Sequence, residues 1–177
     1  MKTKRFLGIL ITLALLIGVF TITASAAVVE GTCGDNAKWK YDDTTNTLTI
    51  FGKGAMTDYS SSSSLPWYDY RNVVTTVVVE RGITHIGNYS FSYFDNLTTA
   101  TIADTVETIG EKVFYSCDNL TSVKLPDSVK IIGRSAFSDC DNLTEIKLPM
   151  SLKSIYSRTF EGCSNLTSFI IPNSVET

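Results

Sequence analysis

Apolar residues recur at a fixed spacing of 23 residues through the C-terminal two-thirds of the chain. Four columns define the repeat, namely an Ile-Gly pair, a phenylalanine, an Asn-Leu-Thr triplet and a proline. They occur at Ile86, Ile109 and Ile132 (with Ile155-Tyr156 fourth in the series), at Phe91, Phe114, Phe137 and Phe160, at Asn96, Asn119, Asn142 and Asn165, and at Pro126, Pro149 and Pro172. A period of this length is typical of a solenoid, because each unit buries its apolar face only by stacking on its neighbours. We therefore predict a stack of coils.

Each unit contains the spacing Leu-x-x-apolar-x-apolar, as in Leu120, Val123 and Leu125. Apolar residues two positions apart predict a short strand with one face turned inward. The proline that follows ends this strand, because it cannot donate to a sheet ladder. A second apolar pair, a glycine and a segment such as 134–137 complete the unit. We expect that segment to form one helical turn, which places its phenylalanine inward on the convex side.

The series Ile-Gly-x-x-x-Phe-x-x-Cys-x-Asn-Leu-Thr-x-x-x-Leu-Pro-x-Ser-Val resembles the BspA-like leucine-rich repeats, found in surface proteins of anaerobic bacteria. The likeness extends from Ser63 to the end of the chain. It implies a β-rich α/β solenoid of leucine-rich repeats. It also implies a secreted or surface-attached binding module without enzymatic activity, in some members an adhesin for host matrix proteins or other cells. Two positions depart from the pattern, since Phe94 stands in the cysteine column and Tyr156 in the glycine column.

Residues 27–62 precede the repeats and have a different pattern. Trp39 and Tyr41 alternate with lysines, Leu48 and Ile50 alternate with threonines, and turn-forming residues separate the two stretches. This pattern predicts a β-hairpin, which we expect to cap the first coil, followed by a Ser-rich loop. Five coils then fill residues 63–177. Because no polar capping segment follows them, we expect the sequence to be truncated at its C-terminal end.

The first 26 residues have the pattern of an export signal. Three cations precede an apolar run from Phe6 to Phe20, and Ala24-Ser25-Ala26 supplies the small residues that signal peptidase recognises. An uncleaved membrane anchor is the alternative, since the uncharged stretch is long enough to span a bilayer. We adopt cleavage after Ala26, which predicts a secreted or cell-surface protein with no other membrane contact.

Cleavage also changes the charge of the protein. Of 15 cations, three lie in the leader, so 12 remain against 18 anions, and the formal net charge falls from −3 to −6. An acidic protein lacks the basic footprint of a nucleic-acid-binding domain. The expected partner is therefore a protein or a glycan and not a nucleic acid.

Little in the sequence supports catalysis or a bound cofactor. The chain has one histidine, His85, and neither a Cys-x-x-Cys pair nor a phosphate-binding loop, so we predict no enzyme, no cofactor and no metal site. Cys117, Cys140 and Cys163 form one column. Coils about 4.8 Å apart would allow a disulfide between neighbours, and export favours one. Phe94 in the same column instead indicates a buried apolar position, so free thiols are our interpretation.

The Asn-Leu-Thr triplets also match the signal for N-glycosylation. All four lie in one column, where glycans on coils about 4.8 Å apart could not all be accommodated. We instead expect these asparagines to bond backbone groups at the turn into each strand.

The outward side chains of the predicted strands are the best candidates for a binding site. Solenoids typically bind partners on the extended concave face that such strands form. Six residues of three neighbouring coils are predicted to contact the partner: Thr99, Thr101, Ser122, Lys124, Glu145 and Lys147. The alternative for these six residues is that they form an ordinary solvated surface of the strands with no partner. For the whole protein, an exported adhesion or recognition module is the leading hypothesis. A structural spacer of a larger surface protein and part of an envelope enzyme are the other two.

Overall fold

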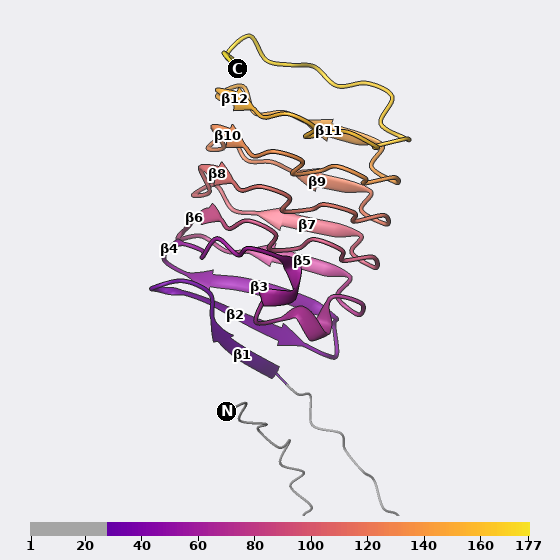
Figure 1. Cartoon of the computed structure of the whole chain (residues 1–177). Helices are drawn as coiled ribbons and strands as arrows, with labels where there is room; N and C mark the ends of the chain where they lie inside the picture. The colour runs from indigo at the N-terminus through magenta and orange to yellow at the C-terminus, as the bar shows by residue number, and fades with distance from the viewer. Residues whose placement is uncertain (1–27) are drawn as a thin grey trace, which may run out of the picture.

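The computed structural model describes residues 28–177, which form a stack of coils rising from three N-terminal strands (Figure 1). One side of the stack is a seven-stranded sheet in the order β1 (Val28–Thr32), β2 (Ala37–Asp42), β3 (Thr47–Gly52), β5 (Thr76–Val79), β7 (Thr99–Ile102), β9 (Ser122–Lys124) and β11 (Glu145–Lys147). The predicted solenoid is thus confirmed. The predicted export signal lies outside the described residues.

A second sheet runs along the stack, with one short strand from each coil. It contains β4 (Gly54–Ala55), β6 (Ile83–Ile86), β8 (Thr108–Ile109), β10 (Ile131–Ile132) and β12 (Ser154–Ile155). The glycine column lets successive coils approach closely beside these strands. A Cβ atom at Gly133 would lie 2.5 Å from the carbonyl carbon of Gly110, a distance that no side chain tolerates.

Stacked aromatic rings fill the space between the two sheets. The ring centroids of Phe114 and Phe137 are 5.3 Å apart, those of Phe137 and Phe160 are 5.7 Å apart, and both pairs lie within 14° of parallel. Phe91 continues the stack toward the N-terminus and packs on Trp67, with 6.4 Å between centroids. The phenylalanine column is therefore a continuous part of the solenoid core, together with the buried aliphatic side chains of the two sheets.

The segment of each coil that carries this phenylalanine is not helical, so the predicted helical turn is wrong. In the described part of the chain the helices are two short 3₁₀ turns, η1 (Ser62–Ser64) and η2 (Tyr68–Tyr70). In residues 111–116, alternate N–H groups donate to the next coil instead, and those of Lys112, Phe114 and Ser116 make bonds of 2.8–2.9 Å. In a helix these N–H groups would instead donate to carbonyl groups of the same segment.

Residues with a left-handed backbone conformation make these hydrogen bonds between coils possible. They form two columns of the repeat, one at Tyr89, Lys112, Ser135 and Arg158 and the other at Tyr93, Ser116, Asp139 and Gly162, with φ between 50° and 77°. Each reverses the local winding of the backbone, so the peptide groups between them turn toward neighbouring coils. Seven of these eight residues are not glycine, which conceals the left-handed positions in the sequence.

The N-terminal cap is built on the expected hairpin, in which β2 pairs antiparallel with β3. The structure adds a third antiparallel strand, β1, on the outer edge of β2. On the other side β3 pairs parallel with β5, so one sheet continues from the cap strands, residues 28–52, into the strands of the repeats. The cap buries Trp39 against Trp67 and stacks Tyr41 on Tyr70, with centroid distances of 5.8 Å and 4.4 Å.

Two side-chain ladders connect successive coils. Each asparagine of the triplet column donates its amide to a carbonyl of the preceding coil, as Asn142 does to Asp118 at 2.8 Å. This confirms the expected backbone bonding. All four cysteines are free, as the sequence indicates for the three of the column, and these three donate their thiols in the same direction. The Cys140 Sγ lies 3.0 Å from the Phe114 carbonyl oxygen.

The last coil differs from the others. The spacing Leu166-x-x-Phe169-x-Ile171 predicts a fifth strand, but none is present there. Its apolar side chains are exposed instead, to 38% at Phe169 and 57% at Ile171, because no further coil packs on them in the described part of the chain.

Candidate functional site

The six predicted contact residues lie together on the outer face of β7, β9 and β11. Each of these strands alternates exposed and buried side chains, with Ala100, Val123 and Ile146 turned into the core. The ladder pairs the six in two columns, which are Thr99–Ser122–Glu145 and Thr101–Lys124–Lys147. All six are exposed. We call this surface the strand face, and its role in binding remains a prediction.

The accessible part of the sheet begins at β7. The same two columns continue toward the N-terminus through Thr76 and Val78 of β5 and then Thr47 and Thr49 of β3. Of these, Thr49 is buried and the other three are half-buried. The strand face is therefore the part of the sheet that a partner can reach most readily.

The charged groups of the strand face have no ionic partner. Within residues 28–177, no carboxylate lies within ion-pair distance of Lys124 or Lys147, and Glu145, two residues before Lys147 on β11, is also unpaired. In contrast, Lys130 and Lys153, just before strands of the second sheet, bind carboxylates one coil away at 2.9 Å and 3.0 Å. Like charges on adjacent strands repel each other, so the strand face presents lysines that the fold leaves uncompensated.

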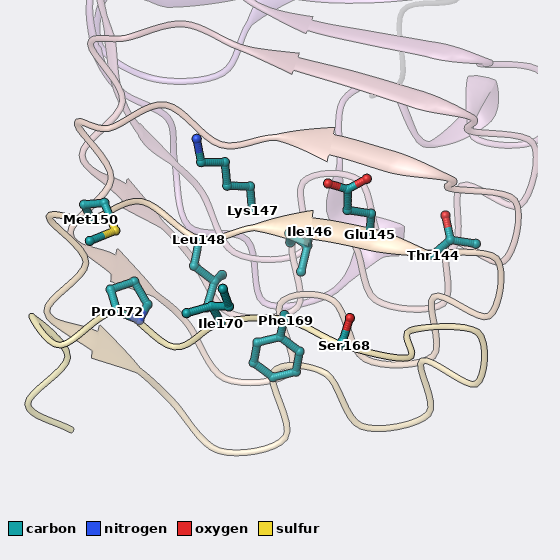
Figure 2. Close-up of a pocket in the computed structure, with 10 residues that line it drawn as sticks. All are labelled: Thr144, Glu145, Ile146, Lys147, Leu148, Met150, Ser168, Phe169, Ile170 and Pro172. Atoms are coloured by element: carbon teal, nitrogen blue, oxygen red, sulfur yellow. The ribbon is translucent and has the colours of Figure 1, made fainter.

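Apolar side chains adjoin these charges. A hollow of ≈ 470 Å³ lies where β11 meets the last coil, and Glu145 and Lys147 form its charged border. Figure 2 shows the Lys147 and Glu145 side chains extending from β11, with Ile170 and Phe169 on the last coil across that strand and Met150 farther along, beyond Leu148. Ile170 is 84% exposed and Met150 is 69% exposed. The combination of unpaired charge and exposed apolar surface is typical of a protein-binding surface.

The cysteine thiols are not equipped for nucleophilic chemistry. Burial raises the pKa of Cys33 to about 12. It also raises the pKa of Cys117, which lies in the cysteine column, well above its ordinary value. Because the thiolate is the nucleophile, these side chains stay protonated and unreactive at neutral pH. Their role is to pack and to bond carbonyl groups.

The histidine has a structural environment. The Nδ1 atom of His85 lies 2.6 Å from the Thr108 hydroxyl, and its Nε2 lies 3.0 Å from the Asp58 carboxylate. Burial acts to raise the pKa of Asp58, but its hydrogen bonds with His85 and the Asn88 N–H lower the pKa overall. The three side chains tie the loop after β4 to β6 and β8.

The described residues show neither of two other kinds of site. Residues 28–177 hold no group of three histidine, cysteine or acidic side chains that could bind a metal ion. Nor does this part of the chain include a helix long and apolar enough to cross a membrane.

The chain belongs to the BspA-type leucine-rich repeat family. The model of the BspA type leucine rich repeat region matches residues 67–177 with six copies, which is more than half of the chain. A leucine-rich repeat protein of Eubacterium ventriosum is similar in structure, with a TM-score of 0.78 and 33% identity over 85% of this chain. The chain spans 39% of the length of that protein.

Two more solved structures share the fold. A leucine rich cell surface protein of Faecalibacterium prausnitzii is 24% identical, with a TM-score of 0.61 over 83% of this chain and 44% of its own. A leucine-rich repeat protein of T. pallidum is 23% identical, with a TM-score of 0.58 over 76% of this chain and 68% of its own. None of the curated proteins shows significant similarity to the chain.

Sequence reasoning missed the apolar border of the strand face. Ile170 continues the column of Thr101, Lys124 and Lys147 in the 23-residue pattern, so its place was available from the spacing. Met150 had no such signal, because it occupies a turn position that holds an aspartate in the preceding coil, Asp127. Its exposure became evident only in the structure.

Proposed function

We propose that this protein is an exported recognition module that binds a protein or glycan of host or neighbouring cells through its strand face. Three charges without an ion-pair partner beside exposed apolar side chains carry the proposal, because charged groups around an apolar patch are the arrangement found at protein interfaces. The family supports a binding role, and the similar protein of Faecalibacterium prausnitzii is described as a cell surface protein. The leader pattern of residues 1–26 supports export.

A protein partner fits this surface better than a glycan. Interfaces between proteins combine an apolar centre with a polar rim, and here Ile170 and Met150 adjoin Lys147 and Glu145. An acidic segment near Lys124 and Lys147 would supply the missing counter-charges. Such a pair of contacts also makes association sensitive to ionic strength, since exposed charges are screened by salt.

The test is binding of the purified protein to an immobilised panel of host extracellular-matrix proteins and to a glycan array. We expect the double change Lys124→Ala and Lys147→Ala to weaken binding about tenfold, or about 1.4 kcal/mol. The matched control is Lys130→Ala with Lys153→Ala, which removes the same charges at the same spacing from the second sheet. This control should bind as the unchanged protein does.

The outcomes separate the hypotheses. Equal binding by both double variants would exclude the strand face as the recognition surface. No binding to any probe at micromolar concentration would favour the alternative, in which the coils are a structural spacer within a larger surface protein.

A further inference from the structure

A second hollow lies outside both sheets, among the turn segments that follow β8, β10 and β12. Its volume is ≈ 460 Å³, within the range of roughly 300–1,000 Å³ that is typical of small-molecule sites. Glu111, Lys112 and Tyr115 line it from one coil, and Arg134 lines it from the next. We call it the turn-face hollow. It shares no lining residue with the strand face.

One aromatic ring, that of Tyr115, lines this hollow, and further tyrosines pack near it. Tyr115 lines it directly, and the ring of Tyr93 supports Tyr115 edge-on, with centroids 5.3 Å apart and planes at 76°. The ammonium group of Lys112 lies over the same Tyr115 ring, 5.6 Å from its centroid, and over the ring of Tyr89, 5.3 Å from its centroid. Tyr93 is 45% exposed, so this cluster of rings is accessible from solvent.

Two of these tyrosines occupy left-handed backbone positions. Tyr89 has φ 63° and Tyr93 has φ 61°, a conformation that is costly for a bulky residue. The fold does not require an aromatic side chain there, because Gly162 fills the position of Tyr93 in a later coil. The left-handed conformation itself belongs to the repeat, since the same two positions adopt it in the later coils, and these two tyrosines lie beside the hollow without lining it.

Polar groups of opposite charge face the hollow without pairing with each other. Glu111 and Arg134 are 23 residues apart, the spacing at which Glu107 and Lys130 form an ion pair of 2.9 Å. Among the described residues, however, neither the Glu111 carboxylate nor the Arg134 guanidinium has an ion-pair or side-chain hydrogen-bond partner. An unpaired acceptor and an unpaired donor are thus held on adjacent coils.

The charges around the hollow cancel. Lys112, Arg134 and Arg158 contribute three positive charges, and Glu111, Asp139 and Glu161 contribute three negative charges. A site for an acidic polymer would be lined by one sign of charge. The ligand that this lining matches is therefore uncharged and carries both hydrogen-bond donors and acceptors.

We propose that the turn-face hollow binds a neutral sugar residue of an oligosaccharide. A sugar ring has an apolar C–H face, which would lie on Tyr115, because an aromatic ring offers an apolar surface. Its hydroxyl groups would donate to the Glu111 carboxylate and accept from the Arg134 guanidinium. The site is independent of the partner proposed for the strand face.

The experiment is a glycan array with neutral, sialylated and sulfated members, followed by titration calorimetry with each purified glycan that binds. We expect binding to neutral glycans. Tyr115→Ala should weaken it at least tenfold, Arg134→Ala should weaken it severalfold, and Tyr115→Phe should preserve it because the ring remains. Tyr156→Ala, which removes an exposed tyrosine that does not line the hollow, is the matched control.

Further measurements keep the proposal falsifiable. Thermal denaturation identifies any variant that fails to fold, and Arg134→Ala, which removes an exposed side chain, then serves in place of Tyr115→Ala. Lys124→Ala with Lys147→Ala should leave glycan binding unchanged, which separates this site from the strand face. The proposal is overturned by an array without neutral ligands, by binding restricted to acidic glycans, or by neutral binding that Tyr115→Ala and Arg134→Ala leave unchanged.

Discussion

Replacing Phe137 by alanine tests whether contacts between neighbouring coils alone hold the solenoid together. The ring is fully buried between Phe114 and Phe160, at centroid distances of 5.3 Å and 5.7 Å. Its removal leaves a cavity and deprives both neighbours of a stacking partner. Changes of this type cost about 3–5 kcal/mol, a large fraction of the about 5–15 kcal/mol that stabilises a natural domain.

The reasoning predicts which coils are destabilised more precisely than it predicts the loss in free energy of unfolding. In a stack, each coil contacts only its neighbours, so stability is a sum of coil terms and interface terms. A defect at Phe137 should therefore uncouple the C-terminal coils from the N-terminal ones. Both tryptophans, Trp39 and Trp67, pack together at the N-terminal end. Their fluorescence reports on that end, whereas far-ultraviolet circular dichroism reports on the whole stack.

Urea denaturation followed by both signals gives the result. In the Phe137→Ala protein, the midpoint measured by circular dichroism should fall well below the midpoint measured by fluorescence. Phe91→Ala is the matched control, because Phe91 packs directly on Trp67 and its loss should lower both midpoints. If Phe137→Ala lowers the two midpoints equally, the coils unfold as one unit and the neighbour-contact reasoning is refuted.

Four further predictions concern the buried thiols, a left-handed turn position and the asparagine ladder. Folded protein should react with Ellman's reagent at Cys33 and Cys140 far more slowly than urea-unfolded protein, because burial raises the pKa of both thiols. The free energy of unfolding should also fall as pH rises above about 9, since these thiols ionise in the unfolded chain first. Ser116→Gly should raise the free energy of unfolding by about 0.5–1 kcal/mol and Ser116→Val should lower it, because Ser116 has φ 52°. Asn142→Ala should lower the free energy of unfolding by about 1 kcal/mol, because it removes the hydrogen bond to the Asp118 carbonyl. Urea titration measures the free energy of unfolding of the Ser116 and Asn142 variants.

The strand face was predictable from the sequence because two periods determine it together. Alternation within a strand turns Val123 inward and Ser122 and Lys124 outward, and the 23-residue period then fixes which residue of the next coil lies beside each. The structure has the expected register, with Lys124 opposite Lys147. No knowledge of side-chain packing was needed for this step.

The phenylalanine segment was not predictable in the same way. One inward phenylalanine per coil is compatible both with a helical turn and with a stacked segment whose peptide groups point along the solenoid. The deciding feature is the left-handed conformation at positions such as Ser135 and Asp139, where the sequence shows no glycine. The turn-face hollow escaped notice for a related reason, since Tyr115 is the one aromatic residue in its column and the Arg134 column has a different residue in each coil.

That lack of recurrence is itself informative in a solenoid. Stacking requires the same contact at every interface between coils, so side chains that make such contacts recur, as the Phe137, Asn142 and Cys140 columns do. A bound partner contacts each coil at a different point, so the side chains that contact it need not be the same from coil to coil. The columns of Thr101, Lys124, Lys147 and Ile170 and of Tyr89, Lys112, Ser135 and Arg158 change chemistry at almost every coil. Recognition is therefore expected on accessible surfaces where the repeat is broken, as it is on the strand face and around the turn-face hollow.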